Sequence, residues 1–144
     1  MTGAFGAVEP RTCPCDDAGL LPYAACCRPL LRGEKQAPTA QALMRSRYTA
    51  YALGRADHVE RTWHPRTRPA MVEIDPALRW TGLVVDAVRD GESSDVEGTV
   101  AFRASWESGS GGTFQSGELE EVSRFERRLG RWFYVEAVTP SATA

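Results

Sequence analysis

The chain has 144 residues, of which 42% are hydrophobic and 25% are charged, a composition typical of a globular protein with one domain and a small appendage. Its formal net charge of −2 offers no bulk electrostatic attraction to nucleic acid or to an anionic membrane. The absence of a run of about 18 apolar residues argues against a membrane span. Residues 1–8 have neither the basic region nor the apolar core of a signal peptide, so we expect a cytoplasmic protein.

The four cysteines form two close pairs near the start of the chain, Cys13 with Cys15 and Cys26 with Cys27. Disulfides are disfavoured in the cytoplasm, and four thiolates favour zinc in tetrahedral coordination. Two disulfides, or four uncoordinated thiols, are the alternative interpretations. The spacing therefore predicts one structural zinc ion. We divide the chain into a flexible tail over residues 1–11, a zinc-binding segment over residues 12–35 and a second unit over residues 36–140.

Residues 39–54 predict a long amphipathic helix, with Thr39 as N-cap and Gly54 as C-terminal stop. In a helical projection one face is apolar and consists of Ala40, Leu43, Met44, Ala50 and Tyr51. The opposite face consists of Arg45, Ser46, Thr49 and Leu53. Arg47 falls within the apolar face, so we expect a buried guanidinium paired with a sheet carboxylate. The candidate carboxylates are Glu118, Glu120, Glu121 and Glu136.

A second, shorter helix follows. Residues 57–60 match a capping box at its start, and Pro65 ends it. Residues 66–77 read as a loop, with one short turn or strand near residues 71–74.

The hydrophobic period then changes from helical to two, which indicates strands. We expect strands over residues 78–89, 96–107, 117–128 and 132–139, with turns at residues 90–94 and 108–112. The first strand should be buried on both faces at residues 83–85. The third should carry a bulge between Leu119 and Val122, where its alternation slips. Helices followed by four consecutive strands predict an α+β fold, in which helices pack on one face of a curved antiparallel meander and form an open cone.

Two motifs carry a resemblance to known families. Cys13-Pro-Cys15 with Tyr23-Ala-Ala-Cys26-Cys27 resembles the SEC-C zinc knuckle, best known from the tail of the SecA translocation ATPase. The usual knuckle has eight residues between its cysteine pairs, whereas this chain has ten. The blocks at residues 43–48, 62–65 and 131–135 are similar to the YchJ-type family of uncharacterised bacterial proteins. That resemblance implies a knuckle followed by a cystatin-like cone similar to nuclear transport factor 2.

The cone offers candidate pocket residues, namely Arg47, Tyr48, Tyr51, Trp63 and His64. His64 has the chemistry of a general base or proton shuttle, although a histidine before proline is more often a capping or core residue. Because no residue that would orient it can be assigned, we designate no catalytic residue.

Two functions stay open, and we expect the first, with the second as its alternative. In the first, the protein is a non-enzymatic interaction module whose zinc knuckle docks on a protein or ribosomal surface, as the resemblance to the SecA tail implies. In the second, the cone is a small-molecule-binding or enzymatic pocket. An open polar cavity that reaches Arg47 would favour the second function, and a cone filled by Trp and Tyr side chains would favour the first. A homodimer formed through the sheet is compatible with either function.

Overall fold

The structure is a computed structural model that describes residues 8–16 and 18–138. Residues 1–7 of the expected tail, and Thr139 at the end of the last expected strand, lie outside the described residues. The helices are η1 (Tyr23–Ala25), α1 (Arg28–Leu31), α2 (Ala40–Leu53) and α3 (Ala56–Arg61). The strands are β1 (Leu78–Asp90), β2 (Glu97–Ser110), β3 (Thr113–Arg128) and β4 (Arg131–Ala137).

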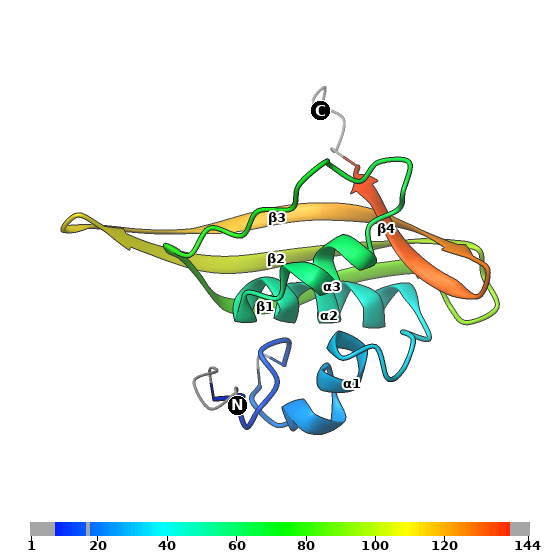
Figure 1. The fold of residues 1–144 in the computed structure, drawn as a ribbon, viewed down its shortest axis with the longest axis horizontal. Helices are drawn as coiled ribbons and strands as arrows, with labels where there is room; N and C mark the ends of the chain where they lie inside the picture. The colour runs from blue at the N-terminus through cyan, green and yellow to red at the C-terminus, as the bar shows by residue number, and fades with distance from the viewer. Residues whose placement is uncertain (1–7, 17, 139–144) are drawn as a thin grey trace.

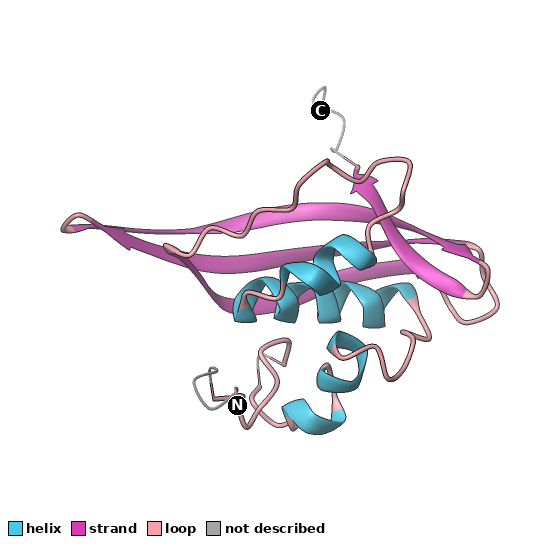
Figure 2. Cartoon of the chain, in the orientation of Figure 1, coloured by secondary structure: helices cyan, strands magenta, loops and turns pink. Residues whose placement is uncertain are grey.

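The molecule has three layers, with α2 in the middle one. The four strands form an antiparallel sheet in the order β1-β2-β3-β4, and α2 and α3 cover one face of it (Figures 1 and 2). The N-terminal segment with η1 and α1 lies on the side of α2 away from the sheet (Figure 1). The expected α+β fold, with helices on one face of a four-stranded meander, is confirmed.

The ends of α2 match the sequence prediction. The Thr39 hydroxyl accepts a hydrogen bond from the Ala42 N–H at 3.0 Å, and Gly54 ends the helix with a φ of 75°. The Ala40 N–H donates to the Gly91 carbonyl at 2.9 Å, which ties the start of α2 to the turn after β1. A Cβ on Gly91 would lie 2.7 Å from the Ala40 Cβ, so this approach requires glycine.

The face of α2 opposite the apolar one is covered as well. Ser46 and Thr49 have no exposed surface, because Thr49 lies against Cys13 and Cys27 of the N-terminal segment and Ser46 lies against His58 of α3. Cys13, Cys15 and Cys27 belong to the same buried cluster as core residues of α2 and the sheet. The cysteine-rich segment therefore shares a core with the cone.

The predicted capping box at residues 57–60 is wrong. Helix α3 begins one residue earlier, at Ala56, and no side chain caps it. Asp57 instead forms ion pairs with Arg55 at 3.0 Å and with Arg61 at 3.4 Å. After α3 the chain makes a parallel bridge between Trp63 and Tyr134. Residues 71–74 form no strand.

The sheet departs from the prediction in two places. In β1, Leu83 is buried but Val84 is 37% exposed, so the strand is not buried on both faces. The expected bulge in β3 is absent, because β2 and β3 pair without a register shift along their whole length. Leu119, Glu121 and Ser123 all point inward and line one cavity. The hydrophobic alternation of β3 is interrupted because the inward position between Leu119 and Ser123 is occupied by a charged residue, Glu121.

The β2–β3 hairpin projects beyond the helices, and Phe114 near its tip is 68% exposed (Figure 1). None of the helices in the described part of the chain is long and apolar enough to cross a bilayer.

Candidate functional site

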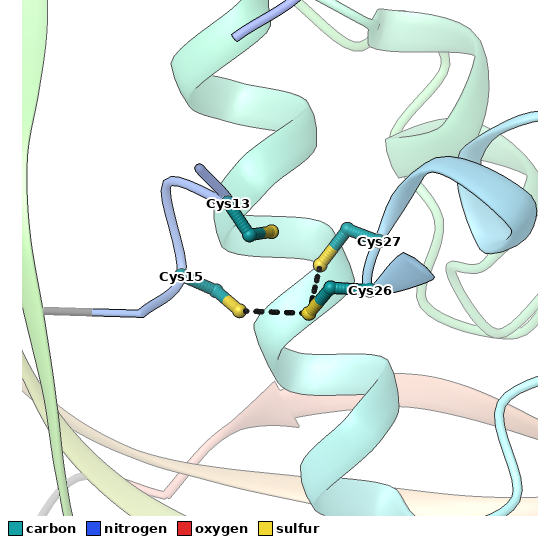
Figure 3. Close-up of side chains that lie close together, drawn as sticks. All are labelled: Cys13, Cys15, Cys26 and Cys27. Carbon is teal, nitrogen blue, oxygen red and sulfur yellow. Dashed lines mark hydrogen bonds between the residues drawn. The ribbon is translucent and has the colours of Figure 1, made fainter. Parts of the chain in front are cut away.

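Two sites lie on opposite faces of α2, and the first is the cysteine cluster. Cys13 and Cys15 come from the N-terminal loop, and Cys26 and Cys27 stand between η1 and α1. Figure 3 shows the four side chains converging beside α2, and their sulfur atoms all lie within 4.8 Å of one another. All four cysteines are free thiols.

The loop between the two pairs is closed by a residue that the sequence reading did not single out. The Asp16 carboxylate accepts hydrogen bonds from the N–H groups of Leu20 and Leu21, at 2.7 and 2.6 Å. The Cys13 N–H donates to the Leu21 carbonyl at 2.8 Å, and Gly19 adopts a φ of 69° within the loop. An Asx-type turn therefore accommodates the longer spacing between the cysteine pairs.

The geometry of the cluster fits a tetrahedral metal ion. The sulfur of Cys26 lies 3.6 Å from that of Cys15 and 3.9 Å from that of Cys27. A regular tetrahedron of sulfurs around zinc, with Zn–S bonds of about 2.3 Å, has edges of about 3.8 Å. The four cysteines could therefore hold one metal ion.

The four thiols do not all ionise readily when no cation lies among them. Hydrogen bonds from Cys15 and Cys27 lower the pKa of Cys13. The same hydrogen bonds to Cys13 raise the pKa values of Cys15 and Cys27, and burial raises that of Cys26. Negative charge therefore gathers on one sulfur, and full deprotonation calls for a cation among them.

Helix α2 supplies the outer contacts of the cluster. The Thr49 hydroxyl donates to the Cys27 sulfur at 3.4 Å and lies 3.7 Å from the Cys13 sulfur. A guanidinium N–H of Arg45 donates to the Cys15 carbonyl at 2.8 Å. Both residues belong to the face of α2 opposite the apolar one, and their polar groups link the cluster to the cone.

The second site is a cavity of about 170 Å³ between α2 and the sheet. Four of the five predicted pocket residues line it, namely Arg47, Tyr48, Tyr51 and Trp63. Much of the rest of its wall is apolar and consists of Met44, Trp80, Phe102, Ala104, Leu119 and Phe125. Glu121, Ser123 and Tyr134 add polar groups from the sheet. The cone is thus open at the position of Arg47 and is not filled by its aromatic side chains.

Arg47 is buried as predicted, with 6% of its surface exposed, but the expected ion pair is absent. Among the described residues no carboxylate lies within ion-pair distance of its guanidinium. One nitrogen, Nη1, instead donates to the Val59 carbonyl and the Thr62 hydroxyl, both at 2.8 Å. Burial lowers the pKa of Arg47 to about 10, so the group stays charged at neutral pH.

Two aromatic rings hold the Arg47 guanidinium. Its central carbon lies 5.0 Å from the ring centre of Trp63 and 4.5 Å from that of Tyr134. The two rings contact each other edge to face, with their centres 5.1 Å apart. Cation–π contacts replace the predicted carboxylate here, because the segment after α3 carries Trp63 and strand β4 carries Tyr134 to the guanidinium.

Glu121, one of the four carboxylates predicted as partners of Arg47, lines the cavity but forms no ion pair with Arg47. Its carboxylate accepts hydrogen bonds from the Ser123 hydroxyl at 2.6 Å and from the Tyr134 hydroxyl at 3.4 Å. The sequence did signal this residue, through the interrupted alternation of β3, which we read as a bulge. A charged residue at an inward strand position was the better interpretation of that pattern.

His64 lies outside the cavity lining. It is 4% exposed, its Nε2 lies 3.4 Å from the Glu126 carboxylate, and its Nδ1 accepts a hydrogen bond from the Arg66 N–H. The ring packs against Phe133, with the two ring centres 6.1 Å apart. This placement agrees with the simpler reading of His64 as a capping and core histidine.

His58 is a buried polar residue that the sequence reading did not select. The Ser46 hydroxyl donates to the Leu43 carbonyl, so it accepts from Nε2–H of His58 at 2.9 Å. Nδ1 then accepts from Arg61 at 3.2 Å. Burial and the charge of Arg61 lower the pKa of His58 to about 3, so the imidazole is neutral.

Comparison with known proteins places the chain in a family. Residues 39–137 match the family model described as the YchJ middle NTF2-like domain. A UPF0225 protein of Streptomyces coelicolor is 48% identical over 86% of this chain and 92% of its own length. A UPF0225 protein of Deinococcus radiodurans is 44% identical over 88% of both chains.

Two solved structures are similar to the whole chain. The solution structure of a SEC-C motif containing protein from Rhodopseudomonas palustris has a TM-score of 0.75 and 31% identity, and covers 90% of this chain and 99% of its own. A SEC-C motif containing protein from Psychrobacter arcticus shares the fold, with a TM-score of 0.67 and 22% identity over 94% of this chain and 86% of its own. The chain belongs to the uncharacterised YchJ family of bacterial proteins, also named UPF0225.

Proposed function

We propose that this protein binds a small molecule in the cavity of its cone and holds one structural zinc ion in its cysteine cluster. The observation that carries the first part is the buried guanidinium of Arg47, which lines a cavity of about 170 Å³ and has no carboxylate within ion-pair distance among the described residues. Burying a charge without such a pair costs several kcal/mol, so its retention favours a role toward a ligand. The sequence favours a ligand site over a docking module if an open, polar cavity reaches Arg47. This cavity is open there, and Glu121, Ser123 and Tyr134 add polar groups to its largely apolar wall.

The lining supports binding without catalysis. Its single carboxylate, Glu121, is engaged by two hydroxyl groups, and His64 lies outside the lining. General base catalysis needs a base within hydrogen-bond reach of the substrate. We therefore propose a receptor or carrier of a small ligand.

The proposal of zinc is supported by the chemistry of the donor set. Four cysteine sulfurs at tetrahedral spacing favour zinc over the harder divalent cations. Three of the four cysteines are buried against α2, the helix that also carries Met44, Arg47, Tyr48 and Tyr51 into the cavity. A metal ion there would fasten the N-terminal segment to the back of the ligand site.

A binding screen tests the ligand proposal. The full-length protein is titrated with a mixture of small aromatic and aliphatic compounds, and the indole N–H signals of Trp63 and Trp80 are followed by NMR. We expect hits that shift both signals. The change Ala104→Met fills the cavity and should abolish them, whereas Ala87→Met on exposed β1 surface is the matched control. Hits that survive Ala104→Met would place the binding elsewhere and contradict the proposal.

A metal analysis tests the zinc proposal. Protein purified without added metal should contain close to one zinc per chain by elemental analysis. A native protein that lacks zinc and has its thiols paired as disulfides would contradict it.

A second candidate function is docking of the zinc knuckle on a protein or ribosomal surface. The observation that favours it is the loop between the cysteine pairs, where Leu20 is 81% exposed and Leu21 is 49% exposed. Co-sedimentation with ribosomes from the cell of origin tests this role, because Leu20→Asp and Cys26→Ser should both abolish it. Tyr51→Phe, on the cavity face, is the control that should leave it unchanged.

A further inference from the structure

We infer that the ligand of the cavity is a small monocarboxylate, held through its carboxylate by the free edge of the Arg47 guanidinium; this inference rests on the proposed ligand-binding function. The donor count of Arg47 carries it. A guanidinium has five N–H groups, and Nη1 uses its two on Val59 and Thr62. Among the described residues, the three N–H groups on Nε and Nη2 have no hydrogen-bond partner.

The orientation of that free edge is fixed. The rings of Trp63 and Tyr134 lie at 5.0 and 4.5 Å from the guanidinium carbon, and Nη1 is held by two hydrogen bonds. Nε–H and one N–H of Nη2 are parallel, and this pair matches the two oxygens of a carboxylate. A preorganised fork loses little entropy on binding, which is the property expected of a recognition group.

Two further donors of the cavity have no hydrogen-bond partner among the described residues. The indole N–H of Trp63 is buried and unpaired there. The Tyr51 hydroxyl likewise has no hydrogen bond there. One oxygen of the cavity carboxylate, Oε2 of Glu121, already accepts from Ser123 and Tyr134. These unpaired N–H and O–H groups favour a ligand that carries hydrogen-bond acceptors.

Glu121 and the apolar wall limit the class further. The single negative charge of Glu121 repels a second carboxylate, so a monocarboxylate is favoured over a dicarboxylate. The wall of Met44, Trp80, Phe102, Leu119 and Phe125 suits an aromatic or branched aliphatic body. A cavity of about 150 Å³ accommodates benzene in another protein, so the 170 Å³ found here suits one ring or a short branched chain.

The experiment compares two probes of equal shape, phenylacetate and phenylacetamide, by calorimetry on the full-length, metal-replete protein at neutral pH. We expect phenylacetate to bind about 10- to 100-fold more tightly, because hydrogen bonds to a charged partner are the stronger ones. Arg47→Met should remove this preference, because it should weaken the binding of phenylacetate about 10- to 100-fold more than that of phenylacetamide. Arg89→Met, the same change at an exposed position of β1, is the control and should keep the preference.

Glu121→Gln is a second variant, and it tests the inference even if Arg47→Met does not fold. It removes the negative charge, keeps an acceptor for Ser123, and should strengthen phenylacetate binding several-fold without effect on phenylacetamide. Equal binding of the two probes to the unmodified protein would overturn the carboxylate assignment and leave the ligand site standing. Failure of both probes to bind would overturn the carboxylate assignment together with the proposed ligand site.

Discussion

The two faces of α2 differ in whether their buried polar groups have hydrogen-bond partners. On the face toward the cysteine cluster, the hydroxyls of Ser46 and Thr49 have partners and no exposed surface. On the face toward the cavity, Arg47 and the adjacent Trp63, which follows α3, keep N–H groups that have no hydrogen-bond partner within the described part of the chain. Satisfied buried polar groups stabilise and fix a structure, whereas unsatisfied ones cost free energy unless a ligand pairs them. The contrast indicates that one face is built for stability and the other for binding.

The largest effect should come from breaking the metal cluster. Cys27→Ser removes a ligand that is buried in the common core, so we expect loss of the metal ion and of order in the N-terminal segment. Zinc binding to small units that fold with their metal contributes about 10–16 kcal/mol, so the variant should lose at least several kcal/mol of stability. Zinc content and thermal unfolding of the purified variant measure both.

Cys26→Ser gives the matched comparison, because Cys26 is only partly buried. It should release the metal equally while perturbing the packing of α2 less. The sheet should persist in both variants, as far-UV circular dichroism would report. A Cys27→Ser protein that keeps one zinc per chain would contradict this prediction.

The second largest effect concerns Arg47 on the cavity face. Arg47→Ala enlarges the cavity and removes the contacts with two rings, so it should destabilise the protein by about 2–5 kcal/mol. Arg47→Met keeps the volume and removes an unpaired buried charge, so its stability should stay within about 1 kcal/mol of the unmodified protein. Urea denaturation of both variants measures the difference. Equal, large losses for both would indicate that the guanidinium is a structural group and would weaken the proposed contrast.

A smaller effect is expected from Thr49→Val, which deletes one hydroxyl from the cluster face and keeps the shape. The sulfurs of Cys27 and Cys13 lose an outer contact, so metal affinity should fall by about tenfold or more. The accompanying loss of stability should be about 1–2 kcal/mol. Competition with a chromophoric chelator measures the affinity, with exposed Thr81→Val as control. An unchanged affinity would show that the hydroxyl does not support the cluster.

The smallest effect is a pH dependence from His58, which lies behind the cluster face. Its pKa is about 3 in the folded protein and about 6.5 in the unfolded chain, so the unfolded chain takes up the proton first. Stability is therefore fully present above pH 6.5 and is lost progressively as the pH falls toward 3. Between pH 6.5 and 5.5 the loss from this group should be about 1 kcal/mol.

His58→Gln isolates that contribution, because the amide can still donate to Ser46 but does not titrate. Denaturation curves at pH 5.5 to 8 should show a weaker pH dependence for the variant. His64 also has its pKa lowered, by burial and by Arg66, and so it contributes a loss of the same sign in both proteins. An unchanged slope in His58→Gln would contradict the prediction.

Local patterns in the sequence determined a large part of this protein. The caps of α2 at Thr39 and Gly54, the alternation of β2 and the spacing of the cysteines each depend on residues close together in the chain. Such signals need no knowledge of what packs against them. They were sufficient for the α+β fold, for the cysteine cluster and for four of the residues that line the cavity.

Tertiary structure alone decided how those parts meet. Thr49 contacts Cys27, which lies 22 residues earlier in the chain. Tyr134, in the last strand, contacts Arg47 of α2. A helical projection shows which residues share a face but not which layers cover it, so it did not show that Ser46 and Thr49 are buried. In the same way, a strand pattern cannot tell a bulge from an inward charge such as Glu121. Those distinctions depend on contacts between distant segments, which form only when the three layers pack.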